Sequence, residues 1–156
     1  MLTISHDEAR KNPRFEPALS ALLGGQVKVG VLRSGDFGAP DLPISLGVER
    51  KSFPNLVSSM MNGELDEQMT RLCETYAFPV LLIEGLPAPA ADGKVRVWGA
   101  GRAVRYSWVL ATLAAWFGRG AFSLAVEHVG ATPATIAALY RLCEKPRHRE
   151  SFAPKR

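Results

Sequence analysis

Two short stretches decide the fold and the chemistry of this chain: Gly35-Asp36, and Val48-Glu49-Arg50-Lys51 a little further along. We expect each to close an apolar strand, the first covering residues 27–32 and the second covering 44–48. Neighbouring strands of a sheet lie about 4.8 Å apart. The sequence therefore predicts that two carboxylates, with an ammonium beside them, meet at one edge of a sheet.

These residue types suit the hydrolysis of phosphodiesters. Enzymes that act on phosphates usually hold Mg²⁺ by one or two carboxylates, while water and substrate oxygens complete the octahedron. Asp36 and Glu49 are the predicted ligands of a Mg²⁺ or Mn²⁺ ion, which would polarise the phosphate and lower the pKa of a bound water. Lys51 is predicted to orient that water or to stabilise developing charge. Alternate residues of a strand share a face, so Arg50 should point away from Glu49 and Lys51. A surface strand that ends in three charges by chance is the alternative.

Apolar periodicity predicts alternating strands and helices along the rest of the chain. Further strands are expected at residues 2–5, 79–83, 94–98 and 122–127, and helices at 15–23, 53–61, 65–76, 106–117 and 132–143. Residues 37–43 are rich in Pro, Gly and Asp and are expected to form a loop. Thr132 is expected to cap the last helix, with Pro133 in its first turn. Such alternation is typical of a three-layer α/β domain.

Composition bounds the class of protein. At 156 residues, with 47% hydrophobic and 22% charged residues, the chain is expected to form one domain with one core. A net charge of +4 permits a polyanionic partner without identifying one. Cys73 and Cys143 lack the spacing of a zinc site. Since no apolar run is long enough to cross a bilayer and no signal peptide is apparent, we expect a cytoplasmic protein without membrane contact.

The two charged stretches, together with the segments after them, resemble the XPF/Hef nuclease family, which carries the motif GD…ERK-x(3)-D. The segment Asn62-Gly63-Glu64-Leu65, with Gln68, Leu72 and Tyr76, is similar to a helix of that family, and residues 79–85 match its PVLLIEG strand. The resemblance covers roughly residues 2–143 and is strongest from 35 to 85. It implies a three-layer restriction-endonuclease-like core, α/β with a mixed central sheet flanked by helices. Residues 1–144 would form this nuclease domain and residues 145–156 a basic C-terminal tail.

The chain departs from the family pattern at two acidic positions. Asn55 stands where the motif ends in Asp, and Ser5 stands where the first strand of the family ends in Asp. Asp7 is the candidate substitute for that second loss. Glu8 fits the next acid of the family best, which implies a further ligand or base, although an acid at a helix start is an equal alternative. The departures bear on the number of metal ions and on the rate.

The resemblance implies a divalent-metal-dependent DNA endonuclease that cuts branched or flapped DNA in repair or recombination. It also implies a homodimer, for which the apolar helix at 106–117 is a candidate interface; burial of that helix in the core is the alternative. The helicase or helix-hairpin-helix modules of other members do not fit in 156 residues. A stand-alone nuclease of a bacterium or bacteriophage is therefore expected, in the nucleoid or the infected cell. A catalytically weak or inactive DNA-binding scaffold subunit is one rival, and another nuclease of the same core is the second.

Six residues are candidate DNA contacts: Arg50, Gln68, Arg102, Arg105, Arg147 and Arg149. For Arg50, a structural ion pair under the sheet is at least as good an explanation as a phosphate contact. The family counterpart of Gln68 lies near the active site, and a plain exposed glutamine is the alternative. Arg102 and Arg105, with Lys94 and Arg96, suit phosphate contacts, unless they belong to a solvated loop. The arginines of the tail form either a DNA-gripping arm or a solvated end.

Overall fold

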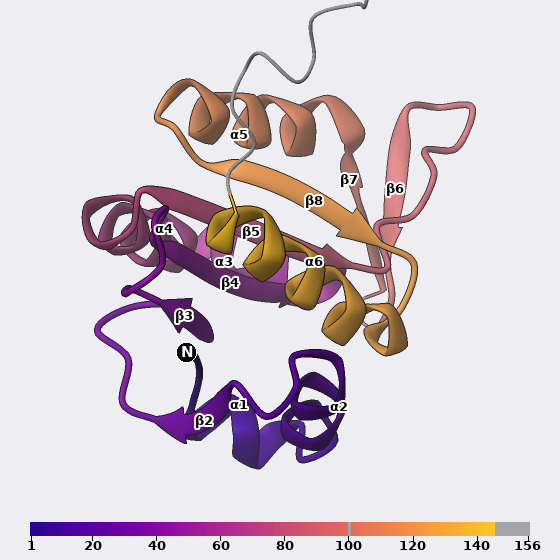
Figure 1. The fold of residues 1–156 in the computed structure, drawn as a ribbon. Coiled ribbons are helices and arrows are strands. Elements are labelled where there is room, and N and C mark those ends of the chain that lie inside the picture. The colour runs from indigo at the N-terminus through magenta and orange to yellow at the C-terminus, as the bar shows by residue number, and fades with distance from the viewer. Residues whose placement is uncertain (100, 146–156) are drawn as a thin grey trace, which may run out of the picture.

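The computed structural model describes residues 1–99 and 101–145. Its centre is a six-stranded mixed sheet in the order β2-β1-β3-β4-β5-β8 (Figure 1). The strands are β1 (Leu2–Ser5), β2 (Val27–Gly30), β3 (Phe37–Ala39), β4 (Leu46–Ser52), β5 (Phe78–Glu84) and β8 (Phe122–Val126). Strand β3 runs antiparallel to its neighbours β1 and β4, whereas the other pairs in the sheet are parallel.

Helices cover both faces of the sheet, which gives the predicted three-layer α/β architecture (Figure 1). The helices are α1 (His6–Lys11), α2 (Phe15–Leu22), α3 (Phe53–Asn62), α4 (Glu64–Thr75), α5 (Tyr106–Gly118) and α6 (Thr132–Glu144), with a 3₁₀ turn η1 (Val129–Ala131). Helices α2 and α6 pack on one face, and α3, α4 and α5 pack on the other. A separate antiparallel hairpin of β6 (Lys94–Val97) and β7 (Arg102–Arg105) joins the second layer.

Strand β5 lies inside the sheet and is buried on both sides. Val80 and Leu82 pack in the cluster that contains α2 and α6, whereas Leu81 and Ile83 pack in the cluster that contains α3, α4 and α5. A strand covered on both faces has no polar side, which is why its sequence is a continuous apolar run. Because β4, β5 and β8 are parallel, their carboxyl ends lie at the same edge of the sheet.

Strand β3 is the main difference from the sequence prediction, which placed a loop at residues 37–43 and made the strands at 27–32 and 44–48 neighbours. Strands β1 and β3 in fact lie between β2 and β4. Asp36 directly precedes β3, which runs antiparallel beside β4, and this brings Asp36 next to β4. The backbone N–H of Asp36 donates to the carbonyl of Val48 at 2.8 Å. With only three residues, β3 is too short to show the alternation that marks a strand.

Two glycines make this antiparallel return possible. Gly38 of β3 and Gly47 of β4 face each other across the strands, and a Cβ atom added at either would overlap the ring of Tyr76. The hydroxyl of Tyr76 donates to the carbonyl of Ser34 at 3.2 Å. The ring of Tyr76 therefore fixes the turn that leads into Asp36.

Smaller differences have local causes. Helix α1 has no range in the sequence prediction, which gave a helix start only as one alternative for Glu8; Ser5 caps this helix by accepting the N–H of Glu8 at 3.2 Å. Strand β2 ends at Gly30 instead of Leu32, and β4 continues through Lys51 to Ser52. Thr132 begins α6 instead of capping it, and no side chain caps that helix at Ala131.

The predicted tail at 145–156, with Arg147 and Arg149, lies outside the described residues except for Lys145, so the division of the chain after residue 144 stays a prediction. Within the described ranges, none of the helices has the length and apolar character needed to cross a membrane.

Candidate functional site

Strand β4 carries the charged motif within the strand itself. Glu49 is only 6% exposed, and its Oε1 lies 3.3 Å from Nζ of Lys51 on the same face of the strand. Asp36 arrives from the start of β3, where its Oδ2 accepts the backbone N–H of Arg50 at 2.8 Å. The structure thus brings Asp36, Glu49 and Lys51 to one place, although through a different pairing of strands. Their metal-binding and catalytic roles stay predictions.

The two carboxylates are poorly compensated. Burial, followed by repulsion from Glu49, raises the pKa of Asp36 from 3.8 to about 6, although the N–H of Arg50 acts in the opposite direction. Burial also raises the pKa of Glu49, and the neighbouring Lys51 opposes that rise. Two partly desolvated carboxylates that repel each other stabilise a cation placed between them.

This donor set fits a hard divalent cation. One or two carboxylates, completed by water and phosphate oxygens, are the usual protein contribution to Mg²⁺ on phosphate substrates. In the part of the chain that the structure describes, no group of three or more His, Cys, Asp and Glu is placed to hold a metal ion. Asp36 and Glu49 would therefore leave most ligand positions to water and substrate, and oxygen donors alone favour Mg²⁺ or Mn²⁺.

A polar pocket of about 420 Å³ opens beside these side chains, and Asn55 and Gln68 also line it. The Nε2 of Gln68 donates to Oε1 of Glu64 at 3.4 Å. Its own Oε1 is buried and has no hydrogen-bond partner among the described residues. A buried acceptor in this state needs a partner such as a water or a cation. Gln68 thus lies at the site as the resemblance implies, while its contact with DNA stays a prediction.

Arg50 points to the opposite face, as the alternation of the strand predicts. Its Nε lies 2.8 Å from Oε1 of Glu8, and its Nη1 lies 2.6 Å from Oε2 of Glu84. The guanidinium also lies over the ring of Phe15, 5.4 Å from the centroid. With its donors directed at two buried carboxylates, Arg50 is better explained by the structural ion pair than by a phosphate contact.

The sequence prediction gives Glu84 no role and Thr132 only that of a helix cap, yet both complete this cluster. The hydroxyl of Thr132, at the start of α6, donates to Oε1 of Glu84 at 2.5 Å. A Glu at the end of a buried apolar strand is the signal that points to them, because a buried carboxylate needs partners. The cluster holds Arg50, whose backbone in turn holds Asp36, so it positions the acidic pair from beneath.

Glu8 belongs to the same cluster. Its carboxylate lies 2.8 Å from Arg50 and also accepts the side-chain N–H of Asn12 at 2.8 Å. Burial and then the charge of Asp36 raise the pKa of Glu8, whereas Arg50 lowers it. These bonds suit a positioning residue, and the role of ligand or base stays a prediction. The neighbouring Asp7 is exposed and pairs with Arg10 and Lys11.

Arg102 and Arg105 are not brought to the acidic pocket. Both lie on β7 and are exposed to solvent, and neither lines that pocket. They belong to a separate surface on the hairpin of β6 and β7.

Comparison with known proteins agrees with the fold and the motif. A family model described as the ERCC4 domain matches residues 5–96, which contain β2 to β5 and both predicted metal ligands. The chain belongs to the ERCC4-domain family. This ERCC4 domain is 39% identical over 69 residues to the 3'-flap repair endonuclease Xpf of Saccharolobus solfataricus.

Solved structures extend the likeness over almost the whole chain. XPF from Aeropyrum pernix matches 93% of this chain with a TM-score of 0.69 and 25% identity. The same protein in a complex with DNA matches 94% of it with a TM-score of 0.68 and 28% identity. The matched part is only 28% of the Saccharolobus protein and 65–66% of the Aeropyrum chains. Both relatives therefore contain further sequence outside the part that matches this chain.

Proposed function

We propose that this ERCC4 domain is a divalent-metal-dependent DNA endonuclease that hydrolyses phosphodiester bonds of branched or flapped DNA. The observation that carries the proposal is the convergence of Asp36, Glu49 and Lys51 at one polar pocket. The names of the relatives support the substrate, since one is a 3'-flap repair endonuclease and another was solved with DNA. A role in repair or recombination and a cytoplasmic location belong to the same proposal.

The side chains divide the chemistry between them. Asp36 and Glu49 would hold Mg²⁺ or Mn²⁺, which when bound polarises the phosphate and acidifies a water. Lys51 brings a positive charge to the pocket, where it can orient the attacking water or stabilise the charge that develops on the phosphate. The buried Oε1 of Gln68 can accept a hydrogen bond from that water. The cluster of Arg50, Glu8 and Glu84 keeps β4 in place, so the reacting groups need little rearrangement.

A homodimer through α5 is part of this proposal. Trp116 of α5 is buried in the core, but Trp108, Leu110 and Phe117 are 38%, 45% and 64% exposed. The ring of Phe117 packs edge-on against Phe122 of the edge strand β8, which is also exposed. Leu110 and Phe117 lie seven residues apart, on the same side of the helix, and exposed apolar side chains that gather in this way are typical of an interface between subunits.

The test is cleavage of labelled single-stranded, duplex, flapped and four-way DNA in Mg²⁺, Mn²⁺ or EDTA. Wild type should cut in either metal and not in EDTA. Asp36→Ala and Glu49→Gln should lose cutting, whereas Glu74→Gln, which changes a carboxylate on α4 away from the pocket, should behave as wild type. Retained cutting by Glu49→Gln would contradict its role as a metal ligand.

A DNA-binding scaffold subunit is the second candidate, and Asn55 is the observation that favours it. Asn55 lines the pocket without supplying the charge that the family motif has at that position. A folded wild type that binds DNA and never cuts it would support the scaffold and refute the nuclease.

A further inference from the structure

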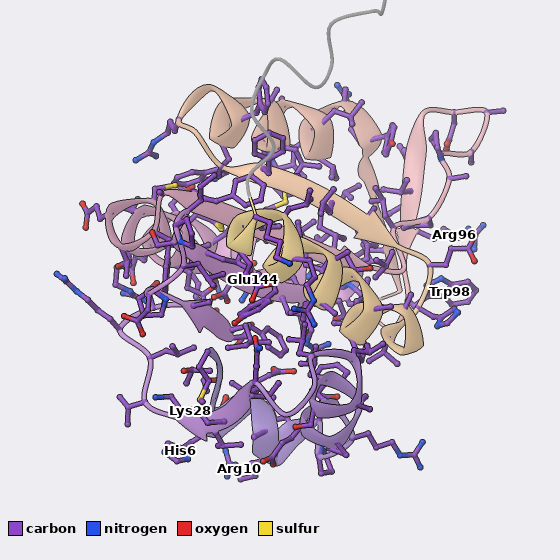
Figure 2. All side chains as sticks on the ribbon, in the orientation of Figure 1. His6, Arg10, Lys28, Arg96, Trp98 and Glu144 are labelled. Atoms are coloured by element: carbon purple, nitrogen blue, oxygen red, sulfur yellow. The ribbon has the colours of Figure 1, made fainter. Side chains whose placement is uncertain are left out.

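The hairpin of β6 and β7 presents two unlike faces. Val95 and Val97 are 0% and 4% exposed because they pack into the cluster that contains α3 and α5. Alternate residues of a strand point to opposite sides, so Lys94 and Arg96 face solvent. Trp98 continues that alternation and is 76% exposed. Figure 2 shows Arg96 and Trp98 projecting away from the body of the molecule.

Positive charge gathers around this indole. In the register of the hairpin, Arg105 lies opposite Lys94, and the small Ala103 lies opposite Arg96. The small side chain leaves space there, and Arg96, Trp98 and Ala103 line a pocket of about 530 Å³. The pocket therefore has an aromatic wall and a cationic wall.

The cations of this surface have no anionic partner in residues 1–99 and 101–145. None of the ion pairs found there involves Lys94, Arg96, Arg102 or Arg105. Asp92 is the carboxylate that lines the pocket, and its Oδ1 accepts the backbone N–H of Lys94 at 3.0 Å. The surface thus combines an exposed indole with cations that remain available to phosphates.

We propose that this surface, Lys94–Trp98 with Arg102 and Arg105, binds the unpaired nucleotides of a branched DNA. A base stacks on the indole of Trp98, while Arg96 and its neighbours contact the phosphates. An aromatic face can stack only on a base that is free of its own duplex, and cations beside it follow the backbone. The inference rests on the proposed function for the identity of the substrate.

The position of the hairpin agrees with this role. Strand β6 packs on α3, the helix that begins directly after the motif of β4. The stacking surface and the acidic pocket therefore share one rigid support. A single DNA strand bound at the hairpin would place the adjoining DNA duplex at a fixed distance from the acidic pocket. Recognition of a branch would in this way be linked to cleavage.

Binding in EDTA tests the inference without any cutting. Anisotropy of fluorescein-labelled single-stranded, flapped and blunt duplex DNA would be measured for wild type, Trp98→Ala and Trp98→Phe. Trp98→Ala should weaken binding of the single strand and the flap by about tenfold, from the loss of one stacked base. It should leave blunt duplex unchanged, and Trp98→Phe should retain most of the affinity. Arg96→Gln should lower the dependence of affinity on salt by about one counterion.

A control and a parallel assay keep the outcomes distinct. Val31→Ala, which removes an exposed apolar side chain outside the hairpin, should bind as wild type. The inference would be overturned if Trp98→Ala bound each of the three DNAs with the affinity of wild type. It would also be overturned if the variant lost as much affinity for blunt duplex as for the single strand and the flap. Cleavage by wild type in Mn²⁺ is measured in parallel. If wild type cuts DNA although Trp98→Ala binds in the way that overturns the inference, the proposed nuclease function still stands. If Trp98→Ala weakens binding of the single strand and the flap as expected but wild type does not cut, the nuclease function is refuted, whereas the binding of unpaired nucleotides by the hairpin is supported.

Discussion

Replacing Asp36 with Asn should stabilise the protein in the absence of metal at pH 8. The fold places Asp36 beside Glu49, and burial followed by this repulsion raises the pKa of Asp36 to about 6. In the unfolded chain the same group ionises near its ordinary value of 3.8. Asn keeps an oxygen that can accept the N–H of Arg50 but carries no charge, so the variant removes the repulsion and keeps the bond.

The magnitude is set by the two pKa values. Asp36 binds its proton more tightly in the folded state than in the unfolded chain. The free energy of unfolding of wild type therefore falls as pH rises from about 4 to about 6, and it stays at the lower value above that range. The difference between 3.8 and about 6 corresponds to about 3 kcal/mol, at ~1.36 kcal/mol per pH unit. Solvent at the rim of the pocket reduces this figure, so we expect a gain of about 1–3 kcal/mol, or about 2–10 °C in Tm.

Thermal unfolding monitored by circular dichroism provides the assay. In EDTA, Asp36→Asn should match wild type at pH 4 and exceed it at pH 8, while Asp41→Asn, at a position outside the acidic pocket, should match wild type at both. Mn²⁺ should raise the Tm of wild type more than that of Asp36→Asn, because only a ligand of the folded state stabilises it. If the Tm of Asp36→Asn relative to that of wild type does not rise between pH 4 and pH 8, the argument that burial and repulsion from Glu49 destabilise ionised Asp36 is refuted.

Three further predictions concern other residues. Glu84→Ala leaves Arg50 with one of its two carboxylate partners and should lower the free energy of unfolding in urea by about 3 kcal/mol; unchanged stability would contradict the buried cluster. Asn55→Asp should tighten Mn²⁺ binding measured by calorimetry and preserve or raise cutting, and a clear loss of cutting would show that the amide has a role of its own. Burial raises the pKa of the Cys143 thiol to about 11, so iodoacetamide at pH 8 should alkylate Cys143 more slowly than the less buried Cys73, as mass spectrometry of the native protein would reveal.

The sequence by itself determined the elements with a strong local pattern. The continuous apolar run of β5, the apolar stripes of α3 and α4, and the almost wholly apolar helix α5 appear where the sequence predicts them. The order of charges in Glu49-Arg50-Lys51 fixed which side chain lies on which face, because successive residues of a strand must alternate. The resemblance of the motif led to the family that the comparisons confirm.

Only the tertiary structure decided how Asp36 reaches Glu49. Strand β3 is too short for a local pattern and exists because β1 and β4 supply hydrogen bonds on both its sides. The partners of Arg50 likewise come from α1 and from the far end of β5. Backbone pairing and buried charge are satisfied by groups that are distant in sequence, so a local pattern fixes the elements, while the sheet order and the cluster beneath the site appear only when the chain is folded.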